Sequence, residues 1–363
     1  MTHMKSAVCY ELGKPLVIDE VTLDSPRRGE VKVRLVATGI CHSDISYLKG
    51  EWGPVPCPVV AGHEGAGIVE EAGDGVTLVK PGDHVVVSML RSCRHCFYCT
   101  SGKPYLCRGF SATPEHKILH TKDGGDVTQG MHTAAFAERA VVDQSQVVPI
   151  PDGVPLESAA LLACSVITGL GAVANTAQVR PGESVVVIGT GGVGLSAIQG
   201  AVLAGARRII AVDVLDTKLE AAGKFGATDG FNAAREDLRD AVRGLTDGLG
   251  ADYVFVTVGS TAAATQGLTL LRAGGALVIV GLPRADARLS FSPTPVALNG
   301  LRILTTYFGA TNLGVDVPHY VDLYRQGRLR LDELITKRYP PEEINEAIEA
   351  TERGEALRNM IVW

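Results

Sequence analysis

Four cysteines lie within one short stretch of this 363-residue chain, with the spacing Cys93-x2-Cys96-x2-Cys99-x7-Cys107. Four thiolates complete the coordination of a tetrahedral zinc ion, as in structural zinc sites. A chain of this length can bury a sufficient core without disulfides, and its N-terminus lacks the pattern of a secretory signal. In a reducing compartment, closely spaced cysteines favour metal binding. The sequence therefore predicts a structural-zinc lobe over residues 93–107 in a cytoplasmic protein.

A second set of soft metal ligands is spread along the sequence. Cys41 and Cys164 lie far apart, with His63 between them. Two sulfurs and one imidazole leave a fourth coordination position for water or substrate, which is the ligand count of a catalytic zinc. The remaining cysteines, Cys9 and Cys57, are expected to be small buried thiols. We therefore expect two zinc ions per chain.

Charge and hydropathy exclude two classes of partner. The net charge is −6, and no run of Lys or Arg offers a surface for nucleic acid. Residues 184–206 carry no charged side chain and are long enough to cross a bilayer. Six glycines divide this segment into a β-branched run, a turn and a small-residue helix. We expect neither nucleic acid nor membrane as a partner.

The pattern of apolar residues changes along the chain. In the first third, Val31, Val33 and Leu35 alternate with charged residues, the period of a half-buried strand. From about Ala159, helix-length spacers separate apolar runs, which predicts a parallel sheet covered on both faces. The predicted strands are Ser184–Ile188, Arg208–Val212, Tyr253–Val258, Ala276–Val280 and Leu301–Thr305, with a further strand at Leu357–Trp363. We expect an α/β protein with one domain of residues 1–165 and 303–363, and a second of residues 166–302.

A glycine-rich turn follows the first of these parallel strands. Gly189-Thr190-Gly191-Gly192-Val193-Gly194 begins a helix, whose N-terminal amides favour a pyrophosphate. Asp213 ends the next strand, nineteen residues after Gly194. Its carboxylate can accept the ribose hydroxyls of adenosine and would repel a 2′-phosphate. The pattern predicts a bound dinucleotide, with NAD preferred to NADP.

Together these motifs resemble the zinc-dependent medium-chain alcohol dehydrogenases over essentially the whole length. The matching segments are Cys41-His42-Ser43-Asp44, Gly62-His63-Glu64-Gly65, the four-cysteine lobe, Cys164 with Thr168-Gly169, the glycine turn, and Gly354-Glu355-Ala356-Leu357-Arg358. The resemblance implies a GroES-like β-rich catalytic domain and a Rossmann domain with a doubly wound parallel sheet, with the active site between them. It also implies a homodimer or homotetramer, and does not choose between these states.

The resemblance implies a role for individual residues around the metal. Cys41, His63 and Cys164 would hold the catalytic zinc, and Glu64 would lie behind it as a transient ligand. Asp44 would accept a hydrogen bond from His63, and Ser43 would lie next to the alcohol oxygen.

The same resemblance implies the residues that bind the cofactor. Thr168, Val193, Val280 and Leu282 would contact the nicotinamide end, Asp213 and Lys218 the adenosine ribose, and His42 and Arg358 the pyrophosphate.

Two departures from the best-known members bear on mechanism and substrate. Ser46 stands where many members carry a histidine, so the exit route of the proton beyond Ser43 stays open. Ser111 stands where the glutathione-dependent formaldehyde branch carries an arginine, which argues against that substrate. By analogy, Trp52, Met89 and Met131 line an apolar pocket suited to primary, allylic or benzylic alcohols.

The expected function is reversible hydride transfer between a small alcohol and NAD, giving an aldehyde or ketone. Which alcohol is physiological, and in which direction, the sequence does not tell. Alternatives within the family are a polyol or S-hydroxymethylglutathione dehydrogenase. A zinc-free quinone or enoyl reductase would lack Cys41, His63 and Cys164. A non-catalytic zinc-stabilised redox or binding protein is the alternative from another class.

Overall fold

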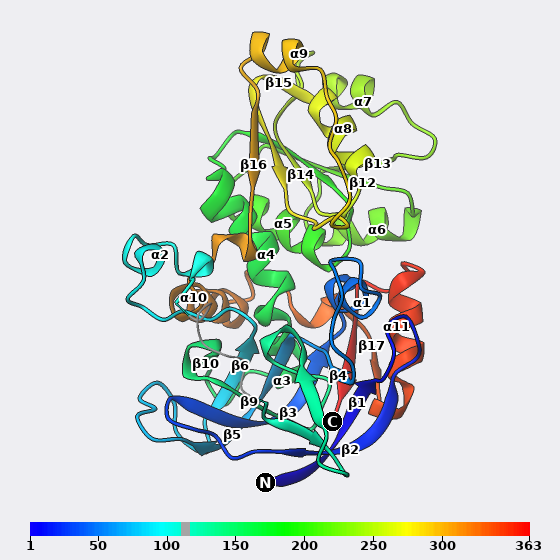
Figure 1. Cartoon of the computed structure of the whole chain (residues 1–363). Coiled ribbons are helices and arrows are strands. Elements are labelled where there is room, and N and C mark those ends of the chain that lie inside the picture. Colours follow the sequence, from blue (N-terminus) through cyan, green and yellow to red (C-terminus); the bar gives the residue numbers. More distant parts are fainter. Residues whose placement is uncertain (110–116) are drawn as a thin grey trace. The chain divides into compact units, whose positions relative to one another are not determined.

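The structure is a computed structural model that describes residues 1–109 and 117–363. The chain divides into two compact units (Figure 1). The first contains Met1–Cys164 and Asn312–Trp363, and the second contains Ser165–Thr311. The sequence placed the return to the first unit after residue 302. The structure places it after Thr311, because strand β16 (Arg302–Thr305) pairs with the sheet of the second unit.

The first unit is built from β-strands in two groups. A closed barrel has the strand order β1 (Thr2–Cys9), β2 (Val17–Leu23), β7 (Leu119–Thr121), β8 (Asp126–Gln129) and β4 (Val59–Val60). A seven-stranded sheet has the order β10 (Val147–Pro149), β6 (His84–Ser88), β5 (Glu64–Ala72), β3 (Glu30–Gly39), β18 (Arg358–Val362) and β17 (Ile335–Tyr339), with β9 (Arg139–Asp143) also paired to β3. The helices of this unit are α1 (His42–Leu48), α2 (Phe97–Thr100), α3 (Leu156–Ala160), α10 (Leu313–Arg325) and α11 (Ile344–Glu352).

Strand β3 illustrates how the sequence pattern produces this packing. Val31, Val33 and Leu35 are buried in one apolar cluster, as their alternation predicts. Lys32, between them, is also buried, and its Nζ atom lies 2.5 Å from Glu71 Oε2 on the neighbouring strand β5. The aliphatic stem of a lysine can cover apolar surface while its ammonium group is paired. The central strand is therefore covered on both faces.

The second unit contains a six-stranded sheet whose strands are all parallel. Its order is β13 (Asp229–Asn232), β12 (Arg208–Asp213), β11 (Ser184–Ile188), β14 (Ala251–Val256), β15 (Leu271–Ile279) and β16. The helices are α4 (Ser165–Gly171), α5 (Gly192–Leu203), α6 (Asp216–Lys224), α7 (Leu238–Leu245), α8 (Thr261–Thr269) and α9 (Pro293–Leu298). Helices alternate with strands in the sequence, which gives the parallel order that the sequence predicted. The order reverses at β11, between β12 and β14, where ligands bind in open α/β sheets.

Several helices of the protein are apolar. Within the described ranges, no single helix is long and apolar enough to cross a bilayer. One bent pair, Leu156–Ala163 with Ser165–Ala177, meets the test by length and composition. Most side chains of this pair are buried within the protein.

Candidate metal centres

Four buried side chains of the first unit meet at one point. Cys41, His63, Glu64 and Cys164 each offer one ligand atom, and these atoms all lie within 4.8 Å of one another. His63 and Glu64 are 0% exposed, and each cysteine is 7% exposed. The residues come from the start of α1, the start of β5 and the turn between α3 and α4. The fold thus brings together the three ligands that the sequence predicted for a catalytic zinc, and Glu64 beside them.

Asp44 holds two of these ligands in place. Its Oδ1 atom lies 2.8 Å from His63 Nδ1, which is the contact that the family resemblance implies. Its Oδ2 atom accepts a hydrogen bond from the backbone N–H of Cys41 at 3.2 Å. With Nδ1 engaged by the carboxylate, Nε2 is the ring atom of His63 that can bind a metal. A single buried carboxylate therefore orients both the imidazole and the backbone that carries the first sulfur.

Two backbone contacts fix the segments that carry His63 and Cys164. Gly62 has a φ of +92°, and a side chain there would meet the backbone nitrogen of Phe136 at 2.5 Å. Only glycine suits this tight approach immediately before His63. The hydroxyl of Ser88 donates to the carbonyl of Ala163 at 2.7 Å, which fixes the residue before Cys164. Ser88 was not predicted as a site residue, because it lies 75 residues away from Ala163 in the sequence.

Arg358 forms a buried ion pair with Glu64. Its Nη2 atom lies 2.6 Å from Glu64 Oε1, and its Nη1 atom donates to the carbonyl of Ile40 at 3.0 Å. The resemblance assigned Arg358 to the cofactor pyrophosphate, whereas in this structure its guanidinium binds Glu64 and is 5% exposed. Burial raises the pKa of the Glu64 carboxyl to about 7, although Arg358 opposes this shift.

The two buried thiols have opposite pKa shifts. The pKa of Cys41 is lowered well below its ordinary value, mainly because its sulfur accepts a hydrogen bond from Cys164. The pKa of Cys164 is raised for the complementary reason, and burial adds to the shift. Burial alone would lower the pKa of His63, but Asp44 and Cys41 raise it. Zinc binds thiolates, so binding of a metal by both sulfurs would displace any proton shared between Cys41 and Cys164.

The donor set fits a zinc ion. Two sulfurs and an imidazole nitrogen are the ligands that zinc prefers, and three of them leave an exchangeable position. Glu64 Oε2 is a buried oxygen without a hydrogen-bond partner among the described residues. A cation in this position would relieve the cost of burying that oxygen. The arrangement is that of a metal centre rather than of packed apolar thiols.

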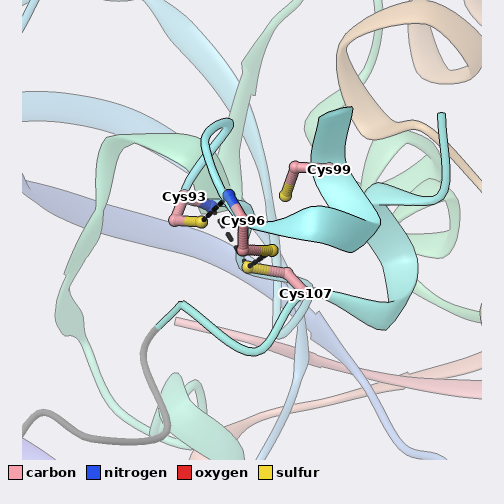
Figure 2. A group of neighbouring side chains, drawn as sticks. All are labelled: Cys93, Cys96, Cys99 and Cys107. Carbon is pink, nitrogen blue, oxygen red and sulfur yellow. Dashed lines mark hydrogen bonds between the residues drawn. The ribbon is translucent and has the colours of Figure 1, made fainter. Parts of the chain in front are cut away.

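The second cysteine group forms a separate centre in the lobe. The ligand atoms of Cys93, Cys96, Cys99 and Cys107 also lie within 4.8 Å of one another, and Figure 2 shows the four sulfurs pointing toward a common centre. Cys99 belongs to α2, and Cys107 follows the 3₁₀ turn Pro104–Leu106. All four side chains are half-buried. The set matches the predicted structural zinc site.

Backbone amides of the lobe point at the sulfurs. The N–H of Cys96 donates to Cys93 Sγ at 3.3 Å, and the N–H of Cys93 donates to Cys107 Sγ at 3.2 Å (Figure 2). The N–H of Gly109 also donates to Cys107 Sγ, at 3.4 Å. Backbone hydrogen bonds lower the pKa of the Cys96 thiol to about 6. Such contacts stabilise thiolates, which are the form that binds zinc.

In the second unit, the predicted carboxylate Asp213 lies beside the predicted glycine turn. Gly194 approaches the preceding turn closely, since a side chain there would meet the carbonyl of Gly189 at 1.9 Å. Asp213, at the end of β12, lies beside this turn. Its Oδ2 atom accepts hydrogen bonds from the N–H and hydroxyl of Thr190 at 2.8 and 3.0 Å, and its Oδ1 atom accepts from the N–H of Val214 at 2.8 Å. The structure thus shows a link between the predicted ribose-binding carboxylate and the predicted pyrophosphate turn.

The other residues of the second unit that were predicted to bind the cofactor lie in several different elements. Gly191 precedes α5, Gly192 and Val193 begin it, and Lys218 lies in α6. Thr168 is a buried residue of α4, whereas Leu282 is 61% exposed in the segment after β15, just beyond Val280.

The remaining predicted cofactor- and substrate-binding residues of the first unit lie in exposed or half-buried positions. His42 is exposed, and Ser43, Trp52, Met89 and Met131 are half-buried. Ser111 lies outside the described residues.

Two family models match this chain. The model described as "Alcohol dehydrogenase GroES-like domain" matches residues 27–152, and that described as "Zinc-binding dehydrogenase" matches residues 192–324. The NDMA-dependent alcohol dehydrogenase of Amycolatopsis methanolica is 39% identical and covers 99% of this chain and 98% of its own. The chain belongs to the zinc-dependent medium-chain alcohol dehydrogenase family.

Two further relatives of this family member bear on its substrate. The S-(hydroxymethyl)glutathione dehydrogenase of Saccharomyces cerevisiae is 38% identical, over 98% of this chain and 95% of that one. The crystal structure of benzyl alcohol dehydrogenase from Acinetobacter calcoaceticus superposes with a TM-score of 0.94 at 32% identity, covering 100% of this chain and 99% of that one. The predicted α/β fold, with a GroES-like domain and a parallel sheet, is confirmed.

Proposed function

We propose that this chain is an NAD-dependent zinc alcohol dehydrogenase that interconverts primary, allylic or benzylic alcohols and their carbonyl products. The observation that carries the proposal is the buried group of Cys41, His63 and Cys164, with Asp44 on the imidazole. Three protein ligands with an open position distinguish a catalytic zinc from the closed four-cysteine lobe. Membership of an alcohol dehydrogenase family supports the same conclusion.

We assign a separate role to each residue in and next to the buried centre. A zinc ion held there supplies Lewis acidity, which makes an alcohol hydroxyl far more acidic than it is in water. Asp44 fixes the tautomer of His63, and the burial of both side chains excludes water from the imidazole. Ser43, two residues after Cys41 and half-buried in α1, is the hydroxyl that we assign to accept the alcohol proton. A nicotinamide held by the second unit would supply the hydride acceptor.

Cofactor choice rests on Asp213. A carboxylate beside the glycine turn would face the 2′-phosphate of NADP, and like charges in a partly buried site cost several kcal/mol in unfavourable cases. The Asp213 carboxylate already accepts four hydrogen bonds, two from Thr190 and one each from the N–H groups of Val214 and Leu215, so a ribose hydroxyl would replace or share one of them. We expect NAD to be used at least about tenfold more efficiently than NADP. The variant Asp213→Gly should narrow this gap in kcat/KM, and equal use of both cofactors by the unmodified enzyme would contradict the assignment.

The substrate class rests on the structural relative and on the apolar residues. Benzyl alcohol dehydrogenase has the same fold over the whole chain. Trp52, Met89 and Met131 are half-buried, and we assign them to an apolar substrate pocket. Benzyl alcohol is therefore the first substrate to test. In solution we expect a homodimer or homotetramer.

A second candidate substrate is S-hydroxymethylglutathione. The yeast relative named for that activity is 38% identical over nearly the full length. Ser111 argues against it, because a serine cannot supply the cation that would bind a glutathione carboxylate.

One assay separates these possibilities. The purified protein is mixed with NAD and either benzyl alcohol or S-hydroxymethylglutathione, and NADH absorbance is followed. The proposal expects NADH formation with benzyl alcohol and a lower kcat/KM with the glutathione adduct. A parallel assay supplies NDMA in place of NAD, because one relative is NDMA-dependent. Turnover that requires NDMA would overturn the use of free NAD, and no turnover in any assay would overturn the enzymatic function.

A further inference from the structure

Two cysteines that belong to neither metal centre lie close to each other at the edge of the barrel. Cys9 is the last residue of β1 and is 0% exposed. It pairs with Val59 of β4 in the antiparallel register, and Cys57 lies two residues before Val59, in the bend that enters β4. This register brings the Cys57 segment beside the end of β1, and the side chains of Cys9 and Cys57 interact. The sequence led us to expect two buried thiols, but Cys57 is exposed.

The two thiols differ in the way that an attacking and a resolving cysteine differ. Cys9 Sγ donates to the carbonyl of Glu11 at 3.2 Å in the barrel wall. Burial raises the pKa of the Cys9 thiol to about 11, and interaction with the neighbouring Cys57 side chain adds to the shift. Cys57 is exposed and is the thiol that a solute can reach, whereas Cys9 is buried. An exposed cysteine beside a second thiol is the arrangement of a redox-sensitive pair.

We propose that Cys9 and Cys57 form a reversible disulfide when a hydroperoxide reacts with the exposed thiol. In the first step, the Cys57 thiolate attacks the O–O bond of hydrogen peroxide, giving Cys57 sulfenic acid and hydroxide. In the second step, the sulfur of Cys9 displaces the sulfenic oxygen, so that an S–S bond forms and the S–O bond breaks. The displaced oxygen leaves as water with the proton of Cys9. Overall, two thiols are oxidised and one peroxide is reduced to two waters.

Formation of this cross-link would require the segment that carries Cys57 to adjust. A disulfide needs Cα atoms about 4.4–6.8 Å apart. Cys9 is fixed in the β1 ladder, whereas Cys57 lies in a bend outside any strand, so the adjustment falls on the bend. The closed loop would contain Cys41 and would end six residues before His63. The bond would thus close a loop that carries Cys41, one ligand of the buried centre.

The test is thiol mapping of the zinc-loaded enzyme after treatment with hydrogen peroxide. Remaining thiols are alkylated under denaturing conditions, and the digest is analysed by mass spectrometry. The proposal expects one cross-linked species joining the Cys9 and Cys57 peptides, released by dithiothreitol. In Cys9→Ala, Cys57 should accumulate as sulfinic acid to a level about tenfold above that in the unmodified enzyme, because no thiol captures the sulfenic acid. In Cys57→Ser, Cys9 should be recovered as an alkylated free thiol.

Three results would overturn the proposal. One is recovery of both cysteines as free thiols after peroxide treatment. Another is sulfinic acid at Cys57 to the same extent with and without Cys9. The last is a Cys9 or Cys57 peptide cross-linked only to a peptide from the zinc centres, with loss of zinc from the protein.

Discussion

The buried centre and the lobe use similar ligands in different surroundings. The lobe gathers four cysteines from one short stretch, and its side chains are half-buried. The buried centre gathers Cys41, His63 and Cys164 from distant segments and is closed off from solvent. Charge explains the difference. Four thiolates around Zn²⁺ leave two negative charges, which solvent and the amides of the lobe can stabilise.

The buried centre is balanced differently. Two thiolates neutralise a zinc ion, and Glu64 is paired with Arg358 at 2.6 Å. Asp44 is the remaining buried carboxylate, and it is satisfied by His63 and by the backbone of Cys41. A centre with an open position and near-neutral charge can exchange a ligand in a dry environment. In the proposed assignment, the buried centre is the reactive site and the half-buried lobe is the structural one.

The largest effect is expected from removing a metal ligand of the buried centre. Cys164→Ala should reduce turnover by about a thousandfold or more, because the metal that polarises the alcohol is lost or displaced. Circular dichroism and Tm should show a folded protein. Cys57→Ala is the matched control, since Cys57 is exposed and lies outside both centres. A Cys164→Ala enzyme with the turnover of that control would refute the catalytic role.

Replacing Ser43, whose hydroxyl we assign to accept the alcohol proton, tests the path by which that proton leaves. Ser43→Ala should slow the hydride step by about a hundred- to ten-thousandfold, the usual contribution of general acid–base assistance. Zinc content and NAD affinity should stay near normal. His42→Ala should instead weaken NADH binding, and it should raise turnover where NADH release limits the rate. Single-turnover kinetics with cofactor titrations compare the two variants. A faster hydride step in Ser43→Ala than in His42→Ala would contradict the assignment.

Asp44 allows a finer test, because it touches no metal itself. Asp44→Asn keeps the shape of the side chain but removes the charge that holds His63 and Cys41. The zinc affinity of the buried centre should fall by about 10–100-fold, while that of the lobe stays unchanged. Competition with a chelator, followed by zinc release, measures both affinities in one experiment. Equal weakening of both centres would show a general loss of stability rather than a local effect.

The lobe should respond in stability more than in turnover. Cys107→Ala opens a closed structural site, and the binding energy of such a site is folding energy. The Tm should fall on the order of 10 °C. The turnover of the fraction that stays folded should change by only about two- to threefold, because no lobe residue belongs to the buried centre. Calorimetry and activity measured on the same preparation separate the two effects.

The sequence predicted the ligands better than it predicted what holds them. Short spacing identified the lobe, and Cys41, His63 and Cys164 were recognised from residue chemistry and family motifs. The contact between Asp44 and His63 was implied by the resemblance and is present. The pairing of Arg358 with Glu64 was not foreseen, because the two residues are 294 positions apart and no local pattern links them.

The parallel sheet followed from the alternation of apolar runs and helix-length spacers. Four of its strands end or begin within about two residues of the predicted bounds, which is the usual uncertainty at strand ends. Strand β15 instead begins at Leu271, five residues before the predicted Ala276, because Leu271 pairs with Ala251 across an irregular register. The point at which the chain leaves the second unit could not be read from composition, because Thr306–Thr311 continue without a charged or proline-rich break.

The most direct test of two zinc centres with separate roles is to measure the zinc content of the unmodified enzyme, Cys164→Ala and Cys107→Ala. We expect two zinc ions per chain in the unmodified enzyme and one in each variant. Turnover per folded molecule should be lost only in Cys164→Ala, and the Tm should fall mainly in Cys107→Ala. A single zinc ion in the unmodified enzyme, or loss of turnover with the lobe zinc rather than with the buried one, would contradict this expectation.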